Sequence, residues 1–192
     1  MSETTFGSSA IATPANAITV ARILITPVLL VMILNADDTA GASWAGFTLG
    51  FVLSMSDAVD GQLARKQGPT RSGAFLDPLA DKFLVLGTLF SLVAVGRFPL
   101  LPVAIIAVRE VAISAYRSYW ARQGMAIPAG SLGKWKTTLQ MWAAATAVLP
   151  ALADSPSWPA DALLAIAVIF TLVSGIQYLT AGRQAMTTEG KL

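Results

Sequence analysis

Six long apolar segments constrain the fold of this chain more than any other feature. They cover about residues 17–34, 42–55, 73–95, 100–122, 134–153 and 160–179. The second segment continues as a helix beyond residue 55 until a break at 67–70. The first alone would extend about 27 Å at 1.5 Å per residue, close to the thickness of a bilayer's hydrocarbon core. With 55% hydrophobic and only 12% charged residues, the composition is too apolar for an ordinary soluble domain. We therefore predict an all-α fold, an integral membrane bundle of six transmembrane helices.

The tails and connections predict the domain organisation and the orientation. We expect an N-terminal tail at 1–15, a single membrane domain at 16–182 and a C-terminal tail at 183–192. Residues 1–15 hold no Lys or Arg, so they lack the positive start of a secretory signal. Basic residues follow the even-numbered segments: Arg65, Lys66, Arg71, Arg122, Lys134, Lys136, Arg183 and Lys191.

The opposite connections carry one basic residue, Arg97, together with Asp37, Asp38 and Asp154. By the positive-inside rule both termini face the cytoplasm, and we expect a multi-pass protein of the plasma membrane. Five tryptophans fall mostly near the predicted span ends, which is typical of an interfacial belt. They are Trp44, Trp120, Trp135, Trp142 and Trp158.

The composition also limits the chemistry. The chain has no cysteine and no histidine, so thiolate and imidazole ligands and the usual general base are all missing. Carboxylates must then carry any acid-base or metal chemistry. The net charge of +2 is mild and the basic residues are scattered through apolar segments, so we expect no nucleic-acid partner.

Four aspartates stand out against this apolar background. Asp57 and Asp60 lie three residues apart, and Asp77 and Asp81 lie four apart, so each pair shares a helix face. Two antiparallel helices joined by a short loop can bring the pairs together. Four carboxylates near bilayer depth would repel one another, each costing about 2.5–3.5 kcal/mol, and they therefore require cations. Oxygen ligands suit Mg²⁺ or Mn²⁺, and two such ions can clamp a phosphate or diphosphate.

The neighbouring residues favour the same interpretation. Gly61 and Gly73 allow a ligand to approach the backbone, Ala64 leaves space on the carboxylate face, and Arg65 offers a guanidinium fork for phosphate oxygens. The alternative is a solvated helix end or an ion-pair network in which Arg65 and Lys82 are the partners. Four aspartates at spacings of 3, 17 and 4 with interleaved Gly and Arg favour a functional site.

These residues resemble the signature of the CDP-alcohol phosphotransferase family, D-x-x-D-G-x-x-A-R followed by G-x-x-x-D-x-x-x-D. Every fixed position is present: Asp57, Asp60, Gly61, Ala64, Arg65, Gly73, Asp77 and Asp81. Further stretches are similar to the phosphatidylglycerophosphate synthases of that family. They include Asn16, Thr19 and Arg22 with Pro27, then Lys82, Arg109 with Glu110, Ile113, Ser114 and Arg117, and finally Gly133, Lys134, Lys136 and Thr137.

The resemblance implies six transmembrane helices, frequently a homodimer, and a cytoplasm-facing cavity that holds two divalent cations, Mg²⁺ or Mn²⁺. It implies attack by the hydroxyl of sn-glycerol 3-phosphate on the lipid-side phosphorus of CDP-diacylglycerol. Asp57, Asp60 and Asp77 would be metal ligands, and Asp81 a ligand or the general base. The residues expected near the CDP moiety are Asn16, Thr19, Gly61, Ala64, Arg65 and Gly73.

An acceptor that carries a phosphate needs a second cationic site. Arg109 and Arg117 lie eight residues apart on one face of their segment, and buried arginines in a membrane helix are usually functional. With Arg71, Lys134 and Lys136 they are our candidates for the acceptor phosphate. The alternatives are an Arg109–Glu110 pair and lysines that serve only as headgroup anchors.

Two other functions compete with this one. Within the family the acceptor could be inositol phosphate, serine or phosphatidylglycerol. From another class, the carboxylates could line a cation transporter, but that function predicts acidic residues spread through the membrane depth, whereas these cluster at one face.

Overall fold

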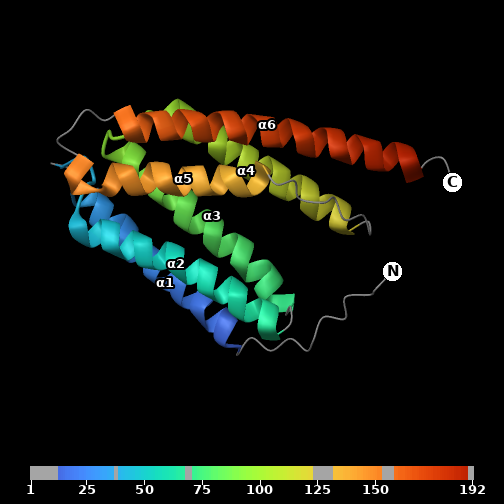
Figure 1. Ribbon diagram of the computed structural model, residues 1–192, viewed down its shortest axis with the longest axis horizontal. Coiled ribbons are helices and arrows are strands. Elements are labelled where there is room, and N and C mark those ends of the chain that lie inside the picture. The colour runs from blue at the N-terminus through green and yellow to red at the C-terminus, as the bar shows by residue number, and fades with distance from the viewer. Residues whose placement is uncertain (1–12, 37–38, 68–70, 123–131, 153–157, 190–192) are drawn as a thin grey trace.

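In the part of the chain that the structure describes, the protein is a bundle of six long helices (Figure 1). The computed structural model describes residues 13–36, 39–67, 71–122, 132–152 and 158–189, without the side chains of 58–67, 71–75, 121–122, 132–134 and 181–189. Within these ranges every long regular element is a helix, which confirms the all-α prediction. The helices are α1 (Pro14–Leu34), α2 (Trp44–Gln67), α3 (Arg71–Ala94), α4 (Leu100–Arg122), α5 (Leu132–Val148), the 3-10 turn η2 (Pro150–Leu152) and α6 (Trp158–Glu189).

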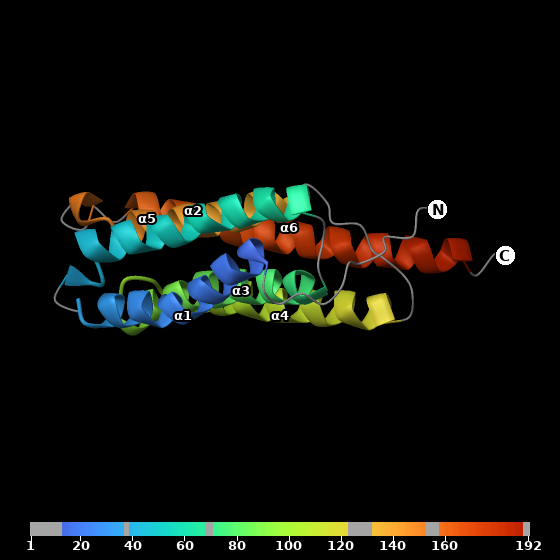
Figure 2. The ribbon, with the colours of Figure 1, turned by 90° about the horizontal axis from the view of Figure 1, so that it is seen from below.

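The helices form two layers of three. Figure 2 shows α1, α3 and α4 on one side and α2, α5 and α6 on the other. The core between the layers is built from side chains of all six helices, among them Leu29, Leu53, Leu89, Ile106 and Leu164. Successive helices run in opposite directions, so the start of α1, the end of α2 and the start of α3 meet at the same end of the bundle (Figure 1).

Several helix boundaries differ from those expected from hydropathy. α1 begins at Pro14, because the Thr13 hydroxyl caps it by accepting a bond from the Asn16 N–H at 3.2 Å. α5 ends at Val148 and not near residue 153, because Pro150 disfavours helix at the residue before it. α6 continues ten residues past the expected end at 179, to Glu189. A helix can continue through polar residues beyond its apolar segment, so hydropathy underestimates its length.

The outer surface is unusually apolar, and several polar side chains are buried together with the apolar core. Leu24, Leu101 and Val108 are about 70% exposed, whereas Arg22, Gln140 and Thr171 are buried. Every long helix carries large exposed apolar side chains. Among the described residues, α1 and the 158–180 part of α6 are each long and apolar enough to cross a membrane. The other helices carry more charge, and their charged side chains include those of the site described below.

The connection between α1 and α2 depends on Gly41. Its φ is +86°, a left-handed conformation, and its N–H donates to the Ala36 carbonyl at 2.6 Å. A Cβ at this position would lie 2.9 Å from Cγ2 of Ile33, which is itself fully buried. Gly96 also has a positive φ, +74°, but a Cβ there would meet nothing within 4 Å.

We predict that Gly41→Ala destabilises the protein more than Gly96→Ala does. Both substitutions incur the left-handed backbone cost of about 1–2 kcal/mol, and only Gly41→Ala adds a clash with a buried side chain. Thermal unfolding of the two purified variants in the same detergent measures the difference. Equal melting temperatures for the two variants would show that the contact with Ile33 relaxes without cost.

Candidate active site

The site is built on one face of α1. Asn16, Thr19, Arg22 and Thr26 follow one another at helical spacing, and each is no more than 2% exposed. This face lies against α2 and α3, which pack on α1. The opposite face of α1 is apolar and exposed, with Leu24 and Val28 as examples. α1 therefore directs its polar residues inward, toward the two helices that carry the aspartates.

Arg22 joins two of the four predicted carboxylates. Its NH1 atom donates to Oδ1 of Asp57 in α2 at 2.8 Å and to Oδ1 of Asp81 in α3 at 2.9 Å. Its Nε lies 3.3 Å from Oγ of Ser56. The guanidinium side chain is fully buried, while those of Asp57 and Asp81 are about 40% exposed. The two carboxylates thus share one buried cation and remain accessible from the other side.

A third carboxylate is held from the same helix. The Thr19 hydroxyl lies 2.7 Å from Oδ1 of Asp77, one turn before Asp81 on α3. Three of the four predicted aspartates are therefore brought together beside α1, as the antiparallel arrangement of α2 and α3 predicted. Asp57 and Asp81 converge here on NH1 of Arg22, and their carboxylate oxygens are of the ligand type that hard divalent cations prefer.

The remaining motif residues lie in helices whose side chains are not described at those positions. Asp60, Gly61, Ala64 and Arg65 belong to α2, and Arg71 and Gly73 belong to the first turn of α3. Lys134 belongs to the first turn of α5. Among the described side chains no group of three acidic residues is close enough to hold an ion. The predicted four-aspartate cage includes Asp60, so it lies in part outside the described residues.

Arg22 had no assigned role in the sequence analysis. The sequence held a signal for it, because Arg22 is the one ionisable residue in the otherwise apolar segment 14–34. An arginine at that depth requires a counter-charge. Only the fold shows that this counter-charge comes from Asp57 and Asp81.

A second cluster of charges lies between α4, α5 and α6. Glu110 of α4 accepts hydrogen bonds from Lys136 of α5 and from NH1 of Arg109, the latter at 3.2 Å. NH2 of Arg109 donates to Oγ of Ser174 in α6 at 2.8 Å. The guanidinium carbons of Arg109 and Arg117 lie 5.8 and 6.0 Å from the ring centroid of Tyr178.

This cluster brings together three of the predicted acceptor-site residues, Arg109, Arg117 and Lys136. Lys136 is buried, with 4% exposure, so it is not a simple headgroup anchor. The Arg109–Glu110 pair that we considered as an alternative is present. Nε of Arg109 is buried without a hydrogen-bond partner, so the donors of this guanidinium are not fully used.

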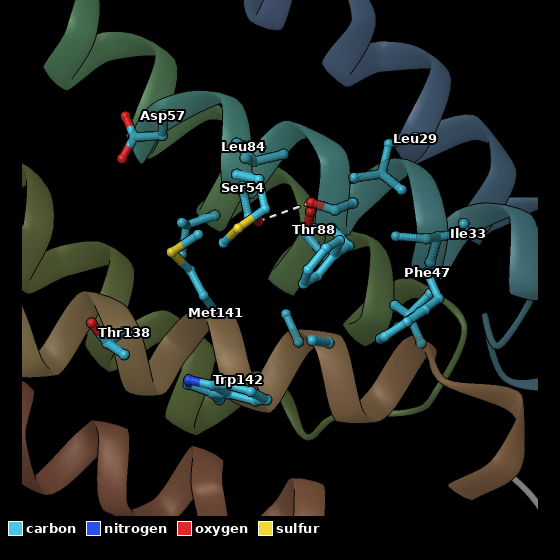
Figure 3. Close-up of a pocket in the computed structure, with 18 residues that line it drawn as sticks. Leu29, Ile33, Phe47, Ser54, Asp57, Leu84, Thr88, Thr138, Met141 and Trp142 are labelled. Atoms are coloured by element: carbon cyan, nitrogen blue, oxygen red, sulfur yellow. Dashed lines mark hydrogen bonds between the residues drawn. The ribbon is translucent and has the colours of Figure 1, made fainter. Parts of the chain in front are cut away.

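A cavity of about 460 Å³ has Asp57 in its wall. Figure 3 shows Asp57 at one edge of it and Phe47 and Ile33 toward the far end. Most of the wall is apolar and comes from α1, α2, α3 and α5. The lining residues include Leu29, Phe51, Met55, Leu84, Val85, Met141, Trp142, Ala145 and Val148. A charged edge and a long apolar interior suit an amphiphile better than a small polar molecule.

Comparison with known proteins decides the family. Residues 12–173 match the family described as CDP-alcohol phosphatidyltransferase. The chain belongs to this family. The match confirms the resemblance inferred from the aspartate motif, and it runs from α1 to the middle of α6.

Curated relatives of this chain align with most of its length. A CDP-diacylglycerol–glycerol-3-phosphate 3-phosphatidyltransferase of Bacillus subtilis is 38% identical over 187 residues, which cover 91% of the chain and 97% of the relative. Enzymes of the same name from Pseudomonas fluorescens and Haemophilus influenzae are 35% and 39% identical. These alignments cover 92% and 71% of the chain, and 93% and 76% of the relatives.

In this family member, we predict that Glu110→Met lowers the free energy of unfolding by about 3 kcal/mol, because it leaves Lys136 buried without a counter-charge. Replacing both partners, Glu110→Met with Lys136→Met, should restore part of the loss, because the buried ammonium is gone while Arg109 still lacks its carboxylate partner. Thermal unfolding of the two variants tests this pair. A double variant no more stable than Glu110→Met alone would contradict the assignment of Glu110 as the partner of Lys136.

Proposed function

We propose that the chain transfers the phosphatidyl group of CDP-diacylglycerol to sn-glycerol 3-phosphate, giving phosphatidylglycerol phosphate and CMP. The observation that carries the proposal is the complete aspartate motif in a chain whose relatives, at 30–39% identity, are named for this reaction. The proposal is also supported by the contacts with α1 that hold the side chains of Asp57, Asp77 and Asp81 on the same side of that helix. The product belongs to phospholipid biosynthesis, in keeping with an apolar, all-helical protein.

The proposed chemistry uses carboxylates as metal ligands. Asp57, Asp60, Asp77 and Asp81 would hold two divalent cations, Mg²⁺ or Mn²⁺, which neutralise charge on the transferring phosphoryl group. Asp81 would take the proton from the acceptor hydroxyl. The hydroxyl oxygen then forms a bond to the lipid-side phosphorus, and the bond from that phosphorus to CMP breaks. In the ion pair with Arg22, the Asp81 side chain is partly exposed while that of Arg22 is buried. This exposure suits a carboxylate that would contact the substrate.

The nucleotide would lie beside the start of α3. Gly61, Ala64, Arg65 and Gly73 are the proposed CDP residues from α2 and α3. Asn16 and Thr19, the two candidates from α1, are buried and Thr19 bonds to Asp77. The support of Thr19 for the nucleotide would therefore be through Asp77 and not through broad contact with cytosine.

We place an acyl chain of the donor in the apolar cavity. Its interior has the chemistry of a lipid tail, and Asp57 marks the edge at which a phosphate would lie (Figure 3). A cavity of about 460 Å³ is within the range of sites that bind small molecules, and it is lined by Phe47, Phe51 and Trp142.

The acceptor phosphate would bind the cluster of Arg109, Arg117 and Lys136, with Lys134 of α5 and Arg71 of α3 as further candidates. The partly unused guanidinium of Arg109 supports this assignment. Because Glu110 already binds Lys136 and Arg109, the acceptor phosphate would share or replace those bonds.

We propose a six-span protein of the plasma membrane with both termini and the active site on the cytoplasmic side. Exposed apolar side chains on every helix and buried charges support a bilayer environment. Trp44, Trp135, Trp142 and Trp158 are each at least 60% exposed, as residues of an interfacial belt would be. A homodimer, as the family resemblance implies, is part of the same proposal.

The direct test is release of CMP by purified protein with CDP-diacylglycerol and Mn²⁺ or Mg²⁺. We expect release with sn-glycerol 3-phosphate and none with inositol phosphate, serine or phosphatidylglycerol. Asp81→Asn should lower the rate about 100-fold or more while largely sparing donor binding, because it removes the proposed base. Release with a different acceptor, or full activity of Asp81→Asn, would overturn the acceptor or the base assignment respectively.

The cavity assignment makes a separate prediction. Ala145→Phe places a ring on the cavity wall and should raise KM for long-chain CDP-diacylglycerol about tenfold, since overpacking costs about 1–3 kcal/mol. KM for a short-chain donor should change little. Ile166→Phe, at an exposed position of α6, adds a ring away from the cavity and serves as the control. An equal rise in KM for both donors would place the acyl chain elsewhere.

A further inference from the structure

Arg22 lies at the centre of the carboxylate cluster but belongs to neither half of the aspartate motif. We propose that Arg22 is a positioning residue that fixes Asp57 and Asp81 in the orientation needed to bind divalent cations. The metal affinity of the site would then depend on the geometry of the guanidinium and not only on its charge. This inference rests on the proposed function, since it concerns the same carboxylates.

The geometry of the contact carries the inference. One nitrogen, NH1, is shared by carboxylates of two different helices, at 2.8 Å from Asp57 and 2.9 Å from Asp81. The Nε contact with Ser56, at 3.3 Å, uses a second edge of the same planar group. Three contacts to one rigid plane define its orientation, and the plane in turn defines the separation of α2 and α3 at the site.

The burial of Arg22 makes this arrangement difficult to relax. Its side chain has no exposed surface, and it extends from a helix whose opposite face is apolar. The charge therefore cannot turn toward water, and the carboxylates of Asp57 and Asp81 compensate it. A lysine at this position would keep the charge, but its ammonium lacks the planar fork and could not reproduce all three contacts.

Thr19 follows the same principle one turn earlier. Its hydroxyl holds Oδ1 of Asp77, as Arg22 holds Oδ1 of Asp57 and Asp81. α1 thus contributes partners to three carboxylates without supplying one itself. Groups that bind the ligands of a metal site in this way orient those ligands, and their replacement typically lowers metal affinity 10–100-fold.

The test is calorimetric titration of the full-length protein in detergent with Mn²⁺ alone. We expect Arg22→Lys, which keeps the charge, to bind Mn²⁺ about tenfold more weakly than the wild type. Arg22→Gln should also bind more weakly, although it removes a positive charge from the site. Unchanged affinity in Arg22→Lys, or tighter binding in Arg22→Gln, would overturn the inference, because either result would show that only the charge of Arg22 matters.

Two further variants keep the test decisive. Arg97→Gln removes an arginine from an ion pair with Asp161 at the other end of the bundle and should leave Mn²⁺ affinity unchanged. Ser56→Ala removes only the contact to Nε and should weaken Mn²⁺ binding to a smaller extent than Arg22→Lys. It replaces the Arg22 variants if thermal unfolding shows that they do not fold. Wild-type affinity in Ser56→Ala would then count against the inference.

The result is separable from the test of function. If Arg22→Lys loses Mn²⁺ affinity but the wild type releases no CMP with any acceptor, the proposed function fails and the positioning role stands. If the wild type releases CMP and Arg22→Lys binds Mn²⁺ normally, the positioning role fails alone. Absence of Mn²⁺ binding by the wild type would overturn the positioning role and the proposed metal cage together.

Discussion

The ion pairs of Arg22 with Asp57 and Asp81 are the interaction on which the site depends. Carboxylates and a guanidinium are each expensive to remove from water, and together they are tolerable only when every charge has a partner. Arg22 is fully buried and supplies that partner to two helices at once. α1, α2 and α3 are thereby joined at one end of the bundle, where the aspartates gather. The relative position of these three helices is therefore set by charge pairing as well as by apolar packing.

The rest of the molecule can be understood as an environment for this cluster. The helices expose large apolar side chains on their outer faces, while an apolar core and a few buried polar and charged side chains, such as those of Arg22 and Glu110, fill the interior. A second polar cluster, centred on Glu110, occupies the interface of α4, α5 and α6. The apolar cavity lined by α1, α2, α3 and α5 has Asp57 at one edge. A lipid donor and a phosphorylated acceptor thus have separate candidate sites in one bundle.

Much of this arrangement follows from local rules in the sequence. Hydropathy predicted six helices, and the break at 67–70 was predicted from Gly68 and Pro69. The spacing of Asp77 and Asp81 placed them on one face of a helix, and the fold places both beside α1. The arginine pair of α4 was also predicted to share a face, and both members approach Tyr178.

Other features depend on contacts between helices and could not be read from one segment. Nothing in the 14–34 segment identifies which of the four aspartates pairs with Arg22. The burial of Lys136 against Glu110 requires the relative rotation of α4 and α5, which a sequence pattern does not specify. The extension of α6 to Glu189 depends on the helix propensity of residues beyond the apolar segment, about which hydropathy carries no information.

The central claim is that the carboxylates beside α1 form a divalent-cation site for phosphatidyl transfer. The most direct measurement is anomalous scattering from crystals of the protein grown with Mn²⁺ and CDP-diacylglycerol. We predict two anomalous peaks among Asp57, Asp60, Asp77 and Asp81, with the diphosphate of the donor in contact with them. Peaks bound elsewhere, or a diphosphate bound away from these aspartates, would contradict the account.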